Sequence, residues 1–553
     1  MDLVWGSGFY SFIENYKIMK KTVLLIAISL LVNLKLNSQI ISVSLDYKIE
    51  NSPFIIDGQV IDAISKQDNL NTTIFTDYTV KVLSVSKGII NQEYITIRGL
   101  GGSIGESTLQ VCPNSHFDIG DLGTYFISKI TDGIYEPSFL GQSEYVGYKL
   151  EKNSNNKFEL KTNTLDNKSI AATITSVSPL NVNAGIGQVI TIAGTGFGTG
   201  PPSGLKLWVP RANLPGSYIS QSYLFHYVSW TDTEIKYKVS SDAASGKIRV
   251  GFATTYVEAT QPLNINFNIR DQFNANQTGI SPVILASLNN GGIEFTKNTN
   301  FTNQDALNAT LIAMDNWTCS TRIKLSINTT AATSNTNITN DGQNVLFFAN
   351  LGPTVLGLTY SNITACSISG RSYVSDVDLG INSNQPFNYT LNPTTLGQYD
   401  YFNVILHELG HLRNLGHVGN TDDIMYPSLS TGVANRALNI DNIIGGLWTQ
   451  NESENISICS RPLMTLGNCQ ELDNNDFKNL KNEIEIYPNP VSSKLYLNTT
   501  HEVLKVIVFD SSGRIIKRTL IDNNIDFSDL GKGVYLLRIV TNEVVINEKI
   551  IKN

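Results

Sequence analysis

The alternation of hydrophobic and polar residues predicts β-strands over the first part of the chain. Residues 78–85 and 94–98 alternate apolar with polar side chains, which is the period of a strand with one buried face. Glycine-rich turns such as 99–102 separate these runs. We therefore predict a β domain over residues 39–165, in which no motif points to chemistry.

A second group of strand-like runs follows a polar stretch rich in Asn and Lys, residues 152–167. Residues 187–198 and 230–239 combine alternating apolar positions with turn-forming glycines. They resemble an IPT/TIG domain, which implies an immunoglobulin-like sandwich over residues 172–268 that serves as a spacer or binding module. The glycine-rich loop 194–200 lacks the Lys-Ser/Thr and the following helix of a phosphate loop, so we interpret it as a turn.

The pattern changes to mixed helix and strand from about residue 274. Apolar residues within 304–317 recur at helical spacing, whereas 323–327, 345–349 and 374–382 are strand-like. We predict an α+β domain over residues 274–470. The fold class is therefore multidomain, with one α+β domain and all-β accessory domains.

Size and charge limit the functions that remain. A chain of 553 residues is too long for one hydrophobic core, so several domains are expected. The net charge of −8 argues against a nucleic-acid partner, because phosphate binding requires a basic surface. We predict no nucleic acid among its partners.

The N-terminal residues have the order of a secretory signal. Lys20 and Lys21 precede the apolar run 23–32, and Ser38 is a small residue at a plausible cleavage position. We predict an N-terminal extension and signal peptide over residues 1–38; whether translation starts at Met1 or Met19 stays open. The apolar run is short for a permanent span, so no membrane helix is expected in the mature protein.

Five cysteines are spread thinly and form no CxxC pair, which argues against a cysteine zinc site. In an exported protein, sequence neighbours suggest the disulfides Cys319–Cys366 and Cys459–Cys469, with Cys112 left over. The connectivity itself is not fixed by the sequence.

The last 70 residues return to a strand-like pattern. Tyr-Pro-Asn-Pro at 487–490, Asp-x-x-Gly-Arg at 510–514 and Leu-x-x-Gly-Val-Tyr at 530–535 precede a terminal lysine. This order resembles the C-terminal sorting domain of the type IX secretion system, over residues 484–553. The resemblance implies a Bacteroidetes-type bacterium, the type IX machinery as a partner, and delivery to the medium or the outer cell surface.

Half of the six histidines lie within eleven residues, His407-Glu-Leu-Gly-His411-Leu-Arg-Asn-Leu-Gly-His417. On a helix, positions i and i+4 share one face, so His407 and His411 can bind one metal ion. A catalytic zinc ion takes three protein ligands and keeps a fourth position for water. The chain must turn back after His411 for His417 to become the third ligand, and Glu408 then lies beside the metal without binding it.

The wider motif resembles the metzincin signature, in which a glycine makes this turn and a methionine follows. Asn414 stands at the glycine position, and Asn is the residue that next best tolerates a left-handed backbone. Met425 follows His417 by eight residues. Together with Tyr426 and Pro427, which we interpret as structural support, this turn is most similar to the matrixin branch.

The matrixin resemblance implies a secreted zinc endopeptidase acting on proteins or peptides, with one catalytic Zn²⁺ and no other cofactor. Zinc activates a water molecule and Glu408 is the general base. The resemblance also suggests that 374–382 is the edge strand that aligns substrate, that 427–436 is the specificity loop and that 436–448 is the C-terminal helix. Structural Ca²⁺ is possible, as in relatives, but no oxygen-ligand motif supports it.

Two alternatives are weighed against this interpretation. The first is a catalytically inert surface adhesion or binding protein that uses its β domains; an inert descendant has no need to keep Glu408 together with three histidines. The second concerns Cys112, since matrixins can be held latent by a cysteine thiolate on zinc. The surrounding Val-Cys-Pro-Asn lacks the family's latency motif, so a buried structural cysteine is the expected role.

Overall fold

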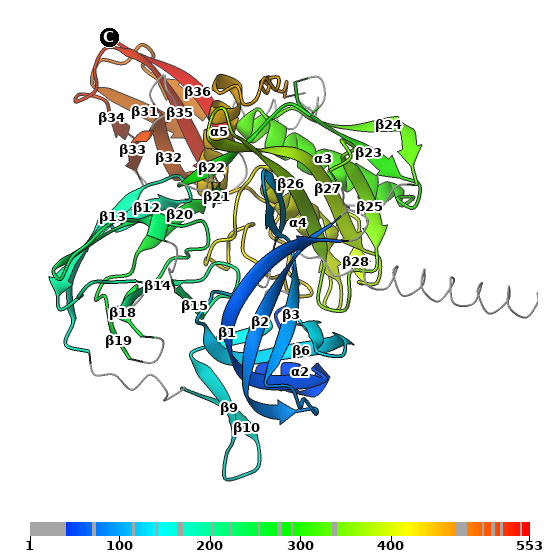
Figure 1. The fold of residues 1–553 in the computed structure, drawn as a ribbon. Helices are drawn as coiled ribbons and strands as arrows, with labels where there is room; N and C mark the ends of the chain where they lie inside the picture. Colours follow the sequence, from blue (N-terminus) through cyan, green and yellow to red (C-terminus); the bar gives the residue numbers. More distant parts are fainter. Residues whose placement is uncertain are drawn as a thin grey trace, which may run out of the picture. The chain divides into compact units, whose positions relative to one another are not determined.

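A computed structural model of the chain describes residues 40–68, 73–112, 117–139, 142–162, 170–201, 204–220, 224–252, 255–273, 279–288, 291–334, 340–469, 484–499, 503–509, 515–519, 524–541 and 545–553 (Figure 1). The chain forms two compact units, Met1–Cys469 and Gln470–Asn553. The predicted signal region 1–38 lies outside the described residues. Within the described ranges, no helix is long and apolar enough to cross a membrane.

The N-terminal part of the first unit is a closed sheet. Its strands follow the order β1-β2-β3-β7-β6-β8, and β1 also pairs with β6, which closes a ring. Alternate residues such as Val80, Ile97 and Tyr125 fill its interior. The elements are α2 (Leu45–Asn51), β1 (Phe54–Gln67), β2 (Ile74–Lys87), β3 (Tyr94–Leu100), β6 (Leu122–Thr131), β7 (Ile134–Pro137), β8 (Glu144–Val146) and the hairpin β9 (Tyr148–Lys152) with β10 (Phe158–Thr162).

The second β region consists of two four-stranded sheets, β11-β13-β17-β16 and β15-β14-β18-β19, with a short parallel pair β12–β20. Residues of both sheets, including Ile192 and Val250, share one apolar cluster. The elements are β11 (Thr173–Ser178), β12 (Asn181–Ala184), β13 (Val189–Thr195), β14 (Lys206–Pro210), β15 (Tyr218–Ser220), η2 (Leu224–His226), β16 (Tyr227–Trp230), β17 (Glu234–Lys238), β18 (Arg249–Gly251), β19 (Tyr256–Glu258) and β20 (Asn264–Asn268). Assignment to the IPT/TIG family stays a prediction.

The third region is built on a nine-stranded sheet whose main order is β24-β23-β25-β27-β26-β5-β4, with β22 paired to β27 and β21 to β22. Helices α3 and α4 pack together beside this sheet, and their side chains share its largest apolar core. The elements are β21 (Asp271–Phe273), β22 (Ile280–Leu285), β23 (Ile293–Asn298), α3 (Gln304–Thr321), β24 (Leu325–Thr333), β25 (Val345–Ala349), β26 (Gly357–Cys366), β27 (Arg371–Asn382), β28 (Phe387–Asn388), β29 (Tyr399–Asp400), α4 (Tyr401–Leu412) and α5 (Ile440–Asn455).

The prediction that residues 374–382 form an edge strand is wrong. Residues 374–382 belong to β27, which lies between β25 and β26 and is buried along almost its whole length. A strand that is paired on both sides and buried on both faces has no free edge for substrate. Among the strands that follow residue 279, the outermost on this side is β26, which runs antiparallel to β27.

Two strands from the N-terminal part extend the same sheet. The hairpin β4 (Gly102–Ile104) and β5 (Ser107–Cys112) lies within the range predicted for the first β domain, yet β5 pairs antiparallel with β26. The sheet therefore combines strands from both ends of the first unit.

The disulfides also differ from the expected pairs. Cys319 bonds to Cys469 and Cys366 bonds to Cys459, so each bridge joins residues far apart in sequence. Sequence proximity gave the wrong partners because the segment after α5 passes back to the end of α3 and to the end of β26. This return is fixed by packing across the sheet rather than by local spacing.

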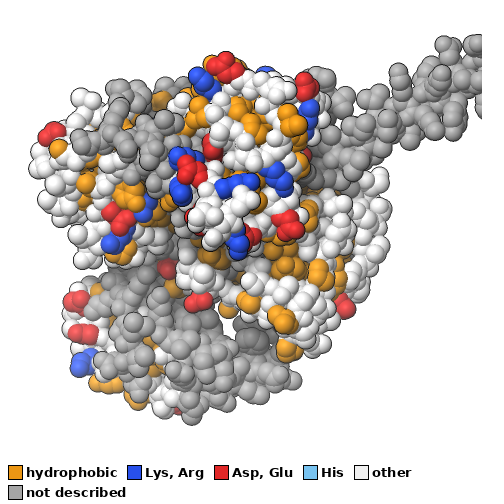
Figure 2. All heavy atoms as spheres, turned by 90° about the horizontal axis from the view of Figure 1, so that it is seen from below, with side chains coloured by type: hydrophobic (Ala, Val, Ile, Leu, Met, Phe, Trp, Pro, Cys, Tyr) orange, Lys and Arg blue, Asp and Glu red, His pale blue; other side chains and the backbone are white. Residues whose placement is uncertain are grey.

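The second unit is a small β structure. A three-stranded sheet β30-β31-β34 and a four-stranded sheet β33-β32-β35-β36 share a core that includes Leu495, Val508 and Leu537. The strands are β30 (Ile484–Tyr487), β31 (Lys494–Thr499), β32 (Val503–Phe509), β33 (Ile515–Thr519), β34 (Asn524–Asp526), β35 (Gly533–Thr541) and β36 (Val545–Lys552). On the face of the molecule drawn in Figure 2, acidic and basic side chains are interspersed.

Candidate metal centre

The helix that carries two of the histidines lies in the core. Asp400 caps α4 by accepting the backbone N–H of Asn403 at 2.7 Å, and Arg436 pairs with the same carboxylate. Every residue of α4 is buried, so the helix is held on all sides by packing. The indole N–H of Trp317 in α3 donates to the carbonyl of Leu406 at 2.9 Å, which fixes α4 against its neighbour.

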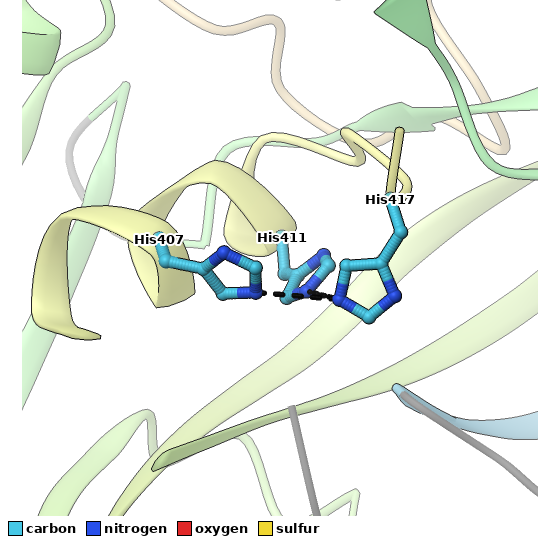
Figure 3. Close-up of side chains that lie close together, drawn as sticks. All are labelled: His407, His411 and His417. Atoms are coloured by element: carbon cyan, nitrogen blue, oxygen red, sulfur yellow. Dashed lines mark hydrogen bonds between the residues drawn. The ribbon is translucent and has the colours of Figure 1, made fainter. Parts of the chain in front are cut away.

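Three imidazoles converge on one point (Figure 3). His407 and His411 project from α4, and His417 reaches back from the loop that follows. The Nε2 atom of His417 lies 3.1 Å from that of His411 and 3.3 Å from that of His407. Tetrahedral zinc with bonds of about 2.0–2.1 Å places its nitrogen ligands about 3.3–3.4 Å apart, so the three rings fit a zinc ion.

The hydrogen bonds of the three rings leave Nε2 available to a metal. Each Nδ1 lies beside an oxygen acceptor: the Ile424 carbonyl at 2.6 Å from His407, the Leu415 carbonyl at 2.8 Å from His411, and Asn213 Oδ1 at 2.7 Å from His417. An oxygen acceptor requires the proton on Nδ1, so the lone pair is on Nε2.

Burial keeps these rings neutral. It lowers the pKa of His407 to about 4 and holds the pKa of His411 and His417 well below the usual value. For His411, the neighbouring imidazoles and the Arg270 guanidinium add to the effect of burial. Neutral imidazole is the form that binds metal, so the site is ready for zinc at neutral pH.

The turn after α4 is made by Asn414. Its φ of 62° is in the left-handed region, and its backbone N–H donates to the His411 carbonyl at 2.9 Å. The Asn414 side chain is buried and donates from Nδ2 to the carbonyl of Val283 at 3.1 Å. A residue with a short amide side chain can therefore adopt the left-handed backbone of this turn and also donate a hydrogen bond to the adjoining strand β22.

Glu408 follows His407 directly on α4 and is fully buried. Thr359 in β26 places its hydroxyl 2.8 Å from Glu408 Oε2 and 2.9 Å from the Glu408 carbonyl oxygen. A Cβ at Gly357 would lie 3.0 Å from Glu408 Oε1, so a glycine leaves room for the carboxylate. The motif predicted Glu408 but gave no signal for Thr359, which becomes a neighbour only through the sheet.

Met425 packs against α4, the helix that carries His407 and His411. It is buried, its N–H donates to Asp423 at 2.7 Å, and its carbonyl accepts the Val418 N–H at 3.1 Å. A Cβ at Gly410 would lie 2.3 Å from the Met425 sulfur, so α4 and this turn are in direct contact. Tyr426 is half-buried and Pro427 is buried in the segment that follows.

Residues at the end of the second β region also donate hydrogen bonds to the backbone of the segment from His411 to His417. Arg270 donates from Nη2 to the His411 carbonyl at 2.5 Å, and its backbone N–H donates to the Asn414 carbonyl at 2.8 Å. Asn268 donates from Nδ2 to the His417 carbonyl at 3.1 Å. These residues precede the histidines by more than 140 positions in sequence, so no local pattern could reveal them.

An acidic pair lies on the other face of the same sheet. Val377 and Leu379 of β27 face the helices, so the alternate residues Asp376 and Asp378 point away from them. Both aspartates are fully buried, and each has one carboxylate oxygen without a hydrogen-bond partner. Burial and the charge of Asp341 raise the pKa of Asp376 to about 7, and burial beside Asp376 raises the pKa of Asp378 well above its usual value.

Comparison with known families agrees with this geometry. Residues 225–445 match the Matrixin family, and this range contains all three histidines, Glu408 and Met425. Residues 485–553 match the secretion system C-terminal sorting domain. No curated protein matches the chain. The predicted resemblances to matrixins and to the sorting domain are thereby confirmed: the chain contains a matrixin-type metzincin domain, a zinc metallopeptidase, followed by a type IX sorting domain that directs it to secretion and surface attachment.

Proposed function

We propose that this protein is a secreted zinc endopeptidase in which His407, His411 and His417 bind one catalytic zinc ion and Glu408 is the general base. The observation that carries the proposal is the convergence of three buried imidazoles whose pKa values are lowered by burial, with the buried Glu408 next to His407 on the same helix. Its substrates are proteins or peptides, and its route out of the cell begins at the predicted leader 1–38, in a bacterium of the Bacteroidetes type.

Bound zinc supplies an activated water and polarises the carbonyl of the scissile bond. Glu408 accepts the proton of the attacking water and delivers it to the leaving amine. Thr359 holds the carboxylate of Glu408 in place through its hydroxyl. Met425 closes the apolar side of the site, and we assign Tyr426 and Pro427 a structural role.

The test is hydrolysis of a broad quenched-peptide library by the purified chain, with and without a zinc chelator. Glu408→Gln keeps one zinc per chain and lowers turnover about 10²–10⁴-fold, which is the usual contribution of a general base. Glu50→Gln, at an exposed position of α2, is the matched control and keeps full activity. Protein that holds one zinc and cleaves nothing in the library would favour the inert binding protein instead.

We also propose a structural calcium ion at Asp376 and Asp378. Two buried carboxylates with unpartnered oxygens are costly unless a cation neutralises them, and hard oxygen ligands suit Ca²⁺. The remaining oxygens of the pair accept the backbone N–H groups of Gly342 at 2.8 Å and Val345 at 2.9 Å, which orients both carboxylates.

A further inference from the structure

Two segments from the N-terminal part of the chain lie along the strand that borders the metal centre. The first is β5, which pairs antiparallel with β26 from Ser107 opposite Thr364 to Cys112 opposite Thr359. Thr359 is the residue whose hydroxyl contacts Glu408. β5 therefore ends on the part of β26 that adjoins the candidate general base.

The second segment is the start of the described chain. Ile40 donates its N–H to the Pro427 carbonyl at 3.1 Å and accepts the Leu429 N–H at 3.3 Å. Ile41 donates to the Thr354 carbonyl at 2.7 Å on the opposite side. Ile40 thus bridges the segment that follows the Met425 turn and the residues that lead into β26, and it is only 3% exposed.

Both segments pair with the same stretch of backbone, residues 355–364. Ile40 pairs antiparallel with Val355, and β5 pairs antiparallel with residues 359–364, so they run in the same direction beside one continuous stretch of backbone. Residues 356–358 lie between the two paired stretches, and the pairing with β5 ends at Thr359. Proteins commonly bind extended peptides by adding them as a strand to a sheet edge. Here that edge is already filled on both sides of Glu408.

We propose that residues 40–41 and β5 hold the enzyme latent by occupying the path of the substrate backbone; this inference rests on the proposed peptidase function. The block is firmly attached, since Leu109 and Val111 of β5 pack in one apolar cluster with Leu358 and Tyr360 of β26. An intramolecular strand also competes at a high effective concentration, so a peptide gains access only in the fraction of molecules in which the segments have opened.

The first test weakens both segments without touching the metal centre. The variant combines Gln110→Pro, in the part of β5 that pairs only with β26, with Ile41→Pro, which removes the N–H donated to Thr354. Proline cannot donate to a ladder and disfavours a paired strand, so peptide hydrolysis rises by about tenfold or more. Glu159→Pro in β10 is the matched control, because β10 pairs only with β9.

Backbone hydrogen exchange separates this inference from the function on which it rests. We expect the β26 amides that face β5 to be protected in the wild type and to exchange faster in the double proline variant, whereas the amides between β26 and β27 stay protected. Lost protection without any hydrolysis would support the claim that β5 covers this edge in the wild type, but it would count against the peptidase function. Unchanged protection and unchanged hydrolysis would overturn the inference.

A second experiment tests latency without the proline substitutions, so its result does not depend on the folding of that variant. A site for a sequence-specific protease is inserted within residues 163–167 of the full chain, and the cut protein is diluted stepwise. The released N-terminal fragment then inhibits as a separate molecule, so specific activity rises on dilution and falls when the fragment is added back. Activity that does not depend on dilution or on added fragment contradicts latency.

A different observation carries a second inference. Two of the imidazoles donate from Nδ1 to backbone carbonyls of the loop that follows α4, whereas His417 donates to the side chain of Asn213, which follows β14 in the second β region. Asn213 is half-buried and 204 positions from His417 in sequence. We infer that Asn213 is a positioning residue that orients the third zinc ligand, so the second β region completes the metal centre.

Zinc affinity tests this role directly. Partners of ligand imidazoles typically change metal affinity about 10–100-fold, so Asn213→Ala raises the zinc dissociation constant by about tenfold and alters the absorption spectrum of the cobalt-substituted protein. Asn213→Asp retains the acceptor and restores both properties. Asn183→Ala is the control, since Asn183 bonds to Asn266 within the same β region. Equal affinity and an unchanged cobalt spectrum in the Asn213→Ala protein would overturn the inference.

Discussion

Asn414 makes the turn between His411 and His417, at the position where the metzincin motif has glycine, so a substitution can compare the two residues there. Replacing it with glycine removes the strain of a left-handed φ of 62°, but it also removes the buried bond from Nδ2 to the Val283 carbonyl. A hydrogen bond contributes about 1 kcal/mol, and glycine adds about 0.5–1 kcal/mol of unfolded-chain entropy. The relief of strain offsets part of this, so Asn414→Gly lowers the free energy of unfolding by about 1 kcal/mol.

Asn414→Ala isolates the backbone contribution. Alanine loses the same bond and keeps the left-handed backbone without a polar side chain to stabilise it, so the loss is about 2 kcal/mol. The assay is urea unfolding followed by zinc release to a chromogenic chelator, which reports on this loop. The control is Asn156→Gly, because Asn156 has a φ of 61° but is exposed, so glycine there is neutral or slightly stabilising. A glycine variant at 414 as stable as the wild type, or equal losses for glycine and alanine, would refute this reasoning.

Four further predictions concern packing, protonation, calcium and disulfides. Gly410→Ala places a methyl group 2.3 Å from the Met425 sulfur, so urea unfolding should show a loss of about 1–3 kcal/mol; an unchanged midpoint would contradict contact between α4 and the methionine turn. Burial lowers the pKa of His407 to about 4, so between pH 6.5 and 4 the unfolded chain binds more protons than the metal-free folded chain. Stability is therefore fully present above pH 6.5 and is lost as the pH falls, and thermal unfolding of chelator-treated protein at pH 7, 6 and 5 measures this trend. Calcium should raise the melting temperature more at pH 8 than at pH 5, because Asp376, with a pKa of about 7, must lose its proton to bind; Asp378→Asn removes the effect and Asp46→Asn, at an exposed position, does not. Cys459→Ser should cost about 2–5 kcal/mol, and non-reduced peptide mapping should recover Cys319 with Cys469 and Cys366 with Cys459; recovery of sequence-neighbour pairs would contradict the fold.

The parts of the site that sequence reasoning identified are those governed by local geometry. His407 and His411 share a helix face because of the i, i+4 spacing, and Asn414 has a backbone conformation that few residues adopt. The strand at 345–349 and the start of α3 at 304 also follow from local patterns. These features need no knowledge of what packs against them.

The remaining features depend on contacts between distant segments. Nothing near Thr359, Arg270 or Asn213 in sequence marks them as neighbours of a metal, because the sheet and the second β region bring them there. The prediction of an edge strand at residues 374–382 was wrong for the same reason. A run such as 374–382 shows that a strand is buried, but not which strand lies beside it.

The bridge between Cys319 and Cys469 has a consequence for maturation. Cys469 is the last residue of the first compact unit, and it is covalently tied to the C-terminal end of α3, the helix that packs against α4. A cut at any later residue that frees the sorting tail therefore leaves Cys469 covalently attached to α3. Force applied to the sorting tail would therefore act on a covalent bond at the end of α3 before it reached the hydrogen bonds of the first unit.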